Sequence, residues 1–162
     1  MIIYIILIIL VLALTFTAFT GAPFVPSRKT DLKVAFEELY PLSERDTLID
    51  LGAGTGTVLK VAEKYKAKTI GVELNPLFAI LARIRTKSKI ICQNFYRYDF
   101  PEETTVIYLF GDSRDILKMY AKVEKEAKKL KKTLYLISLG FPVPGQKIKK
   151  QKGAYYLYQI SA

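Results

Sequence analysis

The residues best suited to chemistry lie in one short stretch, where a carboxylate is followed by three regularly spaced glycines. Asp50, Gly52, Gly54 and Gly56 form the pattern D-x-G-x-G-x-G at the end of the apolar run Thr47–Leu51. Glycine at alternate positions lets the backbone adopt unusual angles and lets a ligand approach the chain closely. Directly after a strand, such a turn predicts a ligand site at the mouth of an α/β sheet.

The spacing of this loop excludes two common phosphate-binding motifs. A dinucleotide fingerprint requires G-x-G-x-x-G, and Thr57 occupies the position of its last glycine. A nucleotide P-loop requires Gly-Lys-Ser/Thr after a longer gap, which is missing here. Because Asp50 would repel a pyrophosphate, the loop favours a ligand with a cationic amino-acid moiety.

A second acidic residue, Glu73, stands at the end of the next apolar run, residues 68–74, just before the helix start Asn75-Pro76. A carboxylate at this strand end can accept both hydroxyls of a ribose. A ribose and a cationic amino acid without any phosphate are the features of S-adenosylmethionine. We therefore predict a site for this cofactor formed by the following residues: Asp50, Gly52, Gly54, Gly56, Glu73 and the adjoining Leu74.

A third contact with the cofactor is expected after the strand over residues 89–94. Asn94 is predicted to form a hydrogen bond with the adenine amine, and Phe95 to stack on the adenine ring. The alternative, equally open from the sequence, is that Asn94 is a turn residue and Phe95 a core residue.

The elements that must position these residues alternate along the chain. Asn75 and Pro76 begin one helix, and apolar residues at helical spacing predict another over 116–130. The chain ends in an aromatic run after Gly153, which predicts an antiparallel hairpin. The fold class is therefore α/β, a doubly wound Rossmann-like sheet of seven strands. The added antiparallel strand favours the seven-stranded methyltransferases over the dinucleotide dehydrogenases.

The first residues of the chain form an uncharged apolar segment. Residues 2–19 contain only two threonines among apolar side chains, and the first charge is Arg28. A single transmembrane anchor is predicted over residues 1–22, followed by a linker over 23–29 and the domain over 30–162. Flanking positive charge places that domain in the cytoplasm. The alternatives are a cleaved signal peptide and a buried core helix.

Composition narrows the chemistry further. The 162 residues include no His and one Cys, which excludes a disulfide framework and all imidazole chemistry, and no metal site is predicted. The net charge is +10, and residues 118–152 alone hold eleven Lys and two Glu. Three explanations of this basic region are open. Contact with anionic membrane lipid ranks first, a solvated helix face second and nucleic-acid binding third.

Four segments resemble the motifs of one family of small seven-stranded (class I) protein lysine methyltransferases. They are Pro-Phe-Val-Pro-Ser at 23–27, the glycine loop at 50–56, Gly-Val-Glu-Leu-Asn-Pro at 71–76 and Phe-Pro-Val-Pro at 141–144. The family includes the archaeal broad-specificity enzyme and membrane-anchored mitochondrial enzymes that methylate the ATP synthase c-subunit and the adenine nucleotide translocase. The resemblance covers nearly the whole chain.

The resemblance implies an enzyme that transfers methyl groups from S-adenosylmethionine to lysine side chains of a protein substrate, with a membrane protein as one candidate. A dry channel for the acceptor would lower the pKa of its amine. Candidates to line the channel are Phe24, Val25, Pro26, Phe110, Phe141 and Pro142, each of which could instead be ordinary packing. The alternatives are a methyltransferase for a lipid or small molecule, or a non-catalytic cofactor-binding module, because Thr55 and Thr57 replace charged residues of the family loop.

Overall fold

The computed structural model describes residues 1, 3 and 4 and residues 29–162. The predicted anchor and linker, with Phe24, Val25 and Pro26, lie outside these residues apart from the few at their ends. Every helix within the described ranges is too short or too polar to cross a bilayer.

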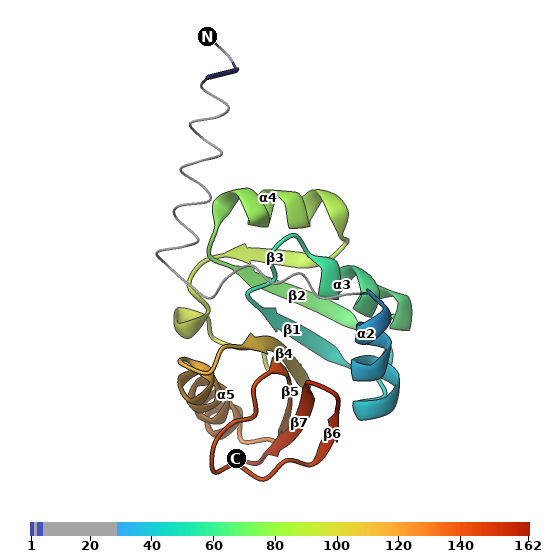
Figure 1. Cartoon of the computed structure of the whole chain (residues 1–162), viewed down its shortest axis with the longest axis vertical. Helices are drawn as coiled ribbons and strands as arrows, with labels where there is room; N and C mark the ends of the chain where they lie inside the picture. The colour runs from blue at the N-terminus through green and yellow to red at the C-terminus, as the bar shows by residue number, and fades with distance from the viewer. Residues whose placement is uncertain (2, 5–28) are drawn as a thin grey trace.

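A seven-stranded mixed sheet forms the centre of the molecule (Figure 1). Its strand order is β3-β2-β1-β4-β5-β7-β6, and β1 to β5 are parallel. β7 runs antiparallel to β5 and pairs with β6, so the predicted sheet and C-terminal hairpin are confirmed. The strands are β1 (Thr47–Leu51), β2 (Lys68–Glu73), β3 (Lys89–Cys92), β4 (Val106–Gly111), β5 (Leu134–Gly140), β6 (Lys150–Lys152) and β7 (Tyr155–Ile160).

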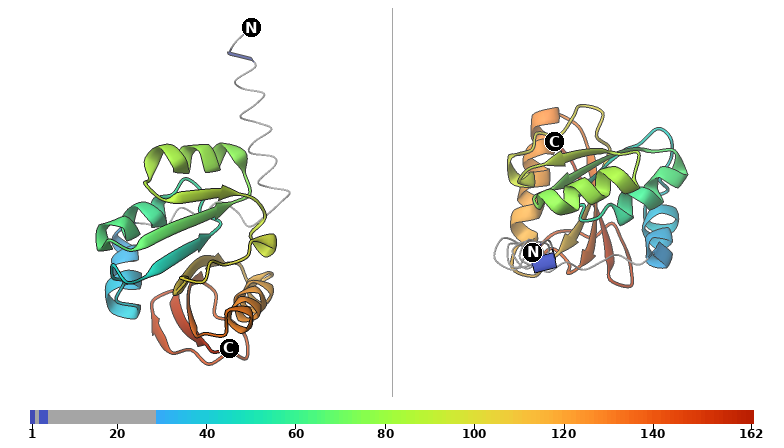
Figure 2. Two further views of the ribbon diagram at one scale, coloured as in Figure 1. Left: turned by 180° about the vertical axis from the view of Figure 1, so that it is seen from behind. Right: turned by 90° about the horizontal axis from the view of Figure 1, so that it is seen from above.

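Helices cover both faces of this sheet (Figure 2). One apolar core lies under α2, α3 and α4, and a second lies under α5. Parallel strands covered on both faces need apolar side chains throughout, and β1 is indeed buried along its whole length. The helical elements are α2 (Lys29–Lys33), η1 (Val34–Leu39), α3 (Thr57–Ala62), η2 (Glu63–Tyr65), α4 (Pro76–Arg85), η3 (Phe95–Arg97) and α5 (Ile116–Leu130).

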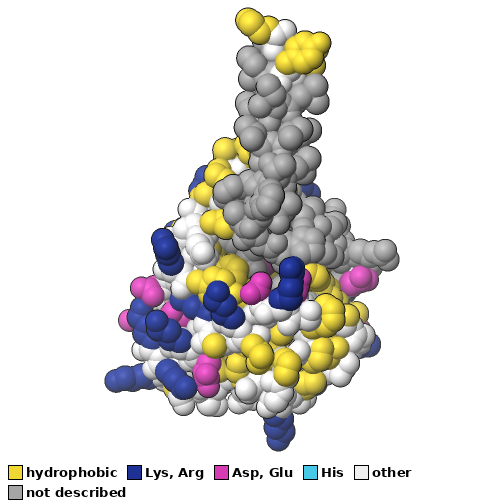
Figure 3. Space-filling model, turned by 60° about the vertical axis from the view of Figure 1, so that its left-hand side comes forward, with side chains coloured by type: hydrophobic (Ala, Val, Ile, Leu, Met, Phe, Trp, Pro, Cys, Tyr) yellow, Lys and Arg dark blue, Asp and Glu magenta, His cyan; other side chains and the backbone are white. Residues whose placement is uncertain are grey.

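Helix α5 confirms the predicted amphipathic helix and carries much of the basic charge. Ile116, Val123 and Ala127 are buried against the sheet, while its outer side presents exposed lysines that include Lys118, Lys125 and Lys128. Figure 3 shows Lys and Arg side chains gathered toward one side of the domain, beside an area of apolar side chains.

The strand order reverses between β1 and β4, which are neighbours in the sheet. In open α/β sheets, ligands bind outside the carboxyl ends of the strands at such a reversal. The glycine loop after β1, Glu73 at the end of β2 and Phe110 near the end of β4 all lie at this edge. The fold thus brings together residues that the sequence separates by up to 60 positions.

Candidate functional site

The loop after β1 takes the unusual backbone angles that its glycines permit. The φ angles of Gly52, Gly54 and Gly56 are +88°, +52° and +81°, all in the left-handed region that side chains disfavour. The N–H groups of Gly52 and Ala53 both donate to the carbonyl of Val72, at 2.8 and 3.1 Å, which fixes the loop to β2. A Cβ atom added to Gly52 would meet no atom within 4 Å, so space is open beside this residue.

Glu73 joins the glycine loop to the start of α4. Its Oε2 accepts the N–H of Gly54 at 2.7 Å, and its Oε1 accepts the N–H of Asn75 at 2.7 Å. The Asn75 side chain in turn accepts the N–H of Leu77 at 2.9 Å and begins α4, as its position before Pro76 predicts. A carboxylate has about four acceptor positions. Glu73 therefore holds the loop in place and keeps capacity for further donors such as ribose hydroxyls.

Asp50 is a carboxylate buried at the end of β1. Its exposed fraction is 2%, and Oδ2 has no hydrogen-bond partner in the part of the chain that the structure describes. Burial, followed by the nearby negative charge of Glu73, raises the pKa of Asp50 to about 8. An unpartnered buried carboxylate oxygen is costly. A cationic ligand in the loop would compensate this cost, so the buried carboxylates and the open glycine loop fit a positively charged nucleoside.

The structure places the predicted adenine contacts in a short turn. β3 ends at Cys92, before the expected residue 94, because the Asn94 side chain accepts the N–H of Tyr96 at 2.9 Å and begins η3. Phe95 is half-buried, and its ring lies 4.3 Å from that of Tyr96 between centroids. Asn94 is exposed, and its Oδ1 has a second acceptor position for an amine. Leu74 is 37% exposed just beyond β2. The cofactor contacts of these three residues stay predictions.

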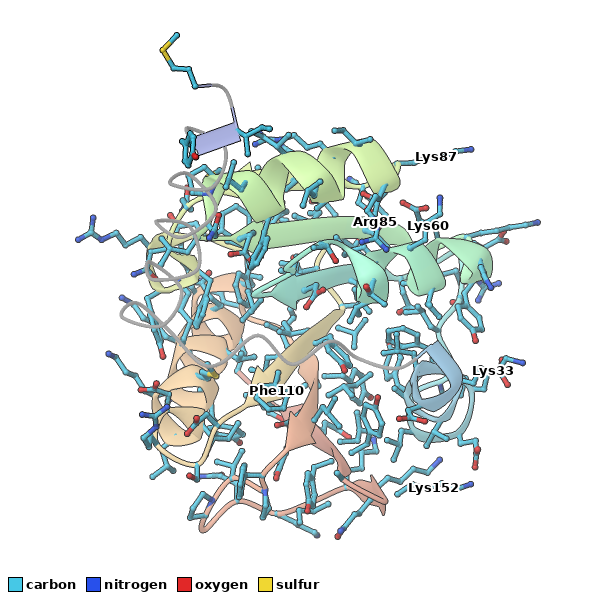
Figure 4. All side chains as sticks on the ribbon, turned by 45° about the horizontal axis from the view of Figure 1, so that its top comes forward. Lys33, Lys60, Arg85, Lys87, Phe110 and Lys152 are labelled. Atoms are coloured by element: carbon cyan, nitrogen blue, oxygen red, sulfur yellow. The ribbon has the colours of Figure 1, made fainter. Side chains whose placement is uncertain are left out.

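On the other side of the sheet reversal, β4 and β5 end side by side at Gly111 and Gly140. A Cβ atom on Gly140 would lie 2.6 Å from the carbonyl oxygen of Gly111 and 3.4 Å from Phe110, so only glycine fits there. Phe110 is half-buried at this strand end (Figure 4). Phe141 follows Gly140 and is 49% exposed, and Pro142 is exposed beside it.

The turn that carries Phe141 is fixed from inside the domain by a residue that the sequence analysis missed. The N–H of Val143 donates to the hydroxyl of Tyr158 on β7 at 2.8 Å. The exposed fractions of Val143 and Tyr158 are 2% and 1%. The apolar spacing of the last strand indicates that Tyr158 is buried, but nothing in the sequence reveals its partner in the turn.

Asp112 directly follows β4 and does not cap the next helix, α5. Its Oδ1 accepts the N–H of Arg114 at 2.9 Å within a turn, and α5 begins only at Ile116. The Arg114 guanidinium holds the pKa of Asp112 at about 2. A carboxylate with so low a pKa is a poor proton acceptor.

The chain is similar in sequence to known enzymes. No protein-family profile matches the chain. A protein-lysine N-methyltransferase from Saccharolobus islandicus is 32% identical over 158 residues, a match that covers 85% of this chain and 95% of that protein.

The chain belongs to the protein-lysine N-methyltransferase family.

A second relative of the chain is the human lysine N-methyltransferase of the ATP synthase c-subunit. It is 26% identical over 129 residues, which cover 75% of this chain and 53% of the human protein. The chain therefore spans about half the length of that relative.

Solved structures confirm the fold of the chain. An RNA methyltransferase from Salinibacter ruber, solved with S-adenosyl-L-homocysteine, has a TM-score of 0.77 at 21% identity and covers 85% of this chain and 94% of its own. A putative methylase from Haemophilus influenzae has a TM-score of 0.60 at 16% identity, with 88% and 94% covered. The chain thus has the fold of S-adenosylmethionine-dependent methyltransferases, in agreement with the cofactor that the sequence predicts.

The described residues fit this cofactor by their chemistry. Glu73 has acceptor positions for ribose hydroxyls, and Asp50 is suited to the cationic amino-acid end. When bound, S-adenosylmethionine supplies an electrophilic methyl group. No group of three or more His, Cys, Asp or Glu that could hold a metal ion occurs in residues 1, 3, 4 and 29–162.

Proposed function

We propose that this enzyme methylates lysine side chains of proteins at a membrane surface. The observation that carries the proposal is the cradle made by the glycine loop, Asp50 and Glu73, in a chain that is 32% identical to a protein-lysine N-methyltransferase over nearly its whole length. Two carboxylates beside a loop without a phosphate-binding motif suit a cationic cofactor that carries no phosphate.

The acceptor side of the site suits an amine that loses its proton by desolvation. Phe110, Phe141 and Pro142 surround the ends of β4 and β5 with apolar surface. Burial in such surroundings favours the neutral form of a lysine amine and so lowers its pKa. With S-adenosylmethionine held by Asp50 and Glu73, the neutral nitrogen would accept the methyl group from the sulfonium, and the methylated amine would lose a proton to water. Positioning supplies the acceleration, consistent with a chain that has no His.

The membrane location is supported by the sequence. Residues 2–19 are apolar throughout apart from two threonines, and Arg28, Lys29 and Lys33 follow them. We propose that this segment anchors the enzyme with its catalytic domain in the cytoplasm. Epitope tags at each end, probed in intact and in permeabilised cells, test this: a C-terminal tag that is accessible in intact cells contradicts it.

The acceptor is tested with the full chain, labelled S-adenosylmethionine and a membrane extract. Mass spectrometry of the products should find methyl groups on protein lysines, and the Glu73→Gln variant should lose them. If labelled methyl groups appeared only in lipids or small molecules, the enzyme would be a methyltransferase for those substrates and not for protein lysines. Cofactor binding without any transfer would leave a non-catalytic binding module.

A further inference from the structure

Helix α4 presents its large aliphatic residues to solvent and its small residues to the sheet. Ala79 and Ala82 are fully buried, whereas the residues on the opposite side are large and 38–76% exposed. These exposed residues follow the spacing i, i+3, i+4, i+7, which places them along one side of a helix. They are Leu77, Ile80, Leu81 and Ile84, and we call them the α4 strip.

This arrangement is the reverse of an ordinary surface helix, whose large apolar residues face the core. Together with Leu74, which is 37% exposed at the end of β2, the α4 strip makes up five of the eight exposed large hydrophobic residues between 29 and 162. Single exposed apolar residues need no explanation, but a contiguous group marks an interaction surface.

Basic residues lie on α4 and in the segment that follows it, where the carboxylate of Glu63 accepts the N–H of Lys87. From Leu74 to Tyr98 there is no acidic residue, and five basic side chains occur, all exposed. At about 100° per residue, Arg83 and Arg85 lie on the two sides of the strip. Figure 4 shows Arg85 and Lys87 at the end of α4. The basic residues are Arg83, Arg85, Lys87, Lys89 and Arg97.

We propose that the α4 strip docks on the surface of an anionic lipid bilayer, with Arg85 and Lys87 at the headgroups. An aliphatic stripe flanked by basic residues is typical of helices that lie in a membrane interface. Protein interfaces are enriched in Tyr, Trp and Phe at their centres, and the α4 strip contains none. The positive flanks complement phosphate headgroups, which an uncharged apolar partner would not need.

Docking through α4 would determine how the cofactor site is oriented relative to the membrane. α4 begins at Pro76, three residues after Glu73, so the α4 strip starts beside the cofactor site. Residues 20–28 can span at most about 30 Å when extended, so a bilayer that holds residues 2–19 would lie within that distance of Lys29. Docking through α4 would therefore orient the mouth of the site along the membrane. It does not require that residues 2–19 span the bilayer.

The experiment uses the full chain with a fluorophore at a single cysteine. In a Cys92→Ser background, Ile84→Cys is labelled with a polarity-sensitive dye, and Leu117→Cys on α5 is the matched control. Leu117 is 53% exposed and lies on α5, the helix that covers the other face of the sheet. Because α5 belongs to the basic region for which the sequence favours lipid contact, the two positions decide between the two faces. The protein is added to vesicles of phosphatidylcholine, alone or mixed with phosphatidylglycerol, that carry a quencher high in the acyl chains.

We expect lipid quenching at residue 84 to be several-fold stronger than at residue 117 in the anionic vesicles. Arg85→Gln combined with Lys87→Gln should reduce the difference several-fold, as should phosphatidylcholine alone or added salt. Activity on a soluble lysine peptide should stay unchanged in this double variant, which shows that the fold is intact.

Three results would overturn the proposal. Equal quenching at residues 84 and 117 would mean that α4 is not the docking face. Self-quenching at residue 84 that unlabelled chain relieves would assign the α4 strip to a second copy. Protection of residue 84 from aqueous iodide without any lipid quenching would assign it to a protein partner or to residues 2–19 of the same chain.

Discussion

The backbone N–H of Val143 donates to the hydroxyl of Tyr158, at 2.8 Å, across the interior of the C-terminal half of the domain. This bond ties the turn after β5 to β7. Phe141 and Pro142, two residues proposed to line the channel for the acceptor lysine, lie in that turn. The hydroxyl of Tyr158 in the core therefore helps to hold them in place.

Replacing Tyr158 with Phe should therefore impair methyl transfer more than cofactor binding. The ring still fills the core, but the buried N–H of Val143 loses its acceptor, which costs about 1–3 kcal/mol. We expect a lower kcat/KM for the protein substrate and an unchanged affinity for S-adenosylmethionine, measured by steady-state kinetics and calorimetry. Tyr156→Phe on the same strand is the control, and equal losses in both variants would contradict the positioning role.

A side chain at Gly56 should destabilise the domain. Its φ of +81° disfavours alanine, and the added Cβ would lie 2.7 Å from Cγ2 of Thr86. Gly153→Ala is a matched control because it shares a positive φ, +56°, but has no atom within 4 Å of the new Cβ. Backbone strain costs about 1 kcal/mol or more in both variants. Because only Gly56→Ala also forces a close contact, we expect its Tm to be several degrees lower than that of Gly153→Ala. Equal melting temperatures in thermal scans would contradict the described packing.

The cofactor-free enzyme should lose stability as the pH rises from about 4 to about 8. In this range Asp50 stays protonated in the folded chain, where burial raises its pKa to about 8. In the unfolded chain the same carboxyl group is already ionised. The folded state thus binds more protons, so its free energy of unfolding falls with pH. Asp50→Asn should remove this dependence and melt at a higher temperature than the wild type at pH 8. A wild type and variant with parallel pH profiles would show that Asp50 ionises normally.

Cofactor binding should release a proton from Asp50 for the same reason. A cationic group beside the carboxylate favours its ionised form, so the affinity of the wild type should rise between pH 6 and pH 8. Calorimetry in buffers of different ionisation enthalpy measures the proton released. Asp50→Asn should bind more weakly and release none.

Local sequence patterns predicted most of the fold, because strand and helix periodicity depends on near neighbours. The seven strands, the Asn75 cap and the glycine loop all follow from such patterns. The contacts that complete the site join distant residues, such as Glu73 with Gly54 and Tyr158 with Val143. The early end of β3 and the turn at Asp112 depend on side-chain caps that compete with the strand or helix. These features require the folded geometry.

The central claim is that Asp50 and Glu73 hold S-adenosylmethionine at the glycine loop, and calorimetric titration of the full chain with this cofactor tests it most directly. We expect the wild type to bind one cofactor and Glu73→Gln to bind about 10- to 100-fold more weakly, the loss expected for charge-assisted hydrogen bonds. Glu103→Gln, which changes an exposed carboxylate paired with Lys68, should bind as the wild type does. A wild type that takes up no cofactor, or a Glu73→Gln variant with unchanged affinity, would contradict the account.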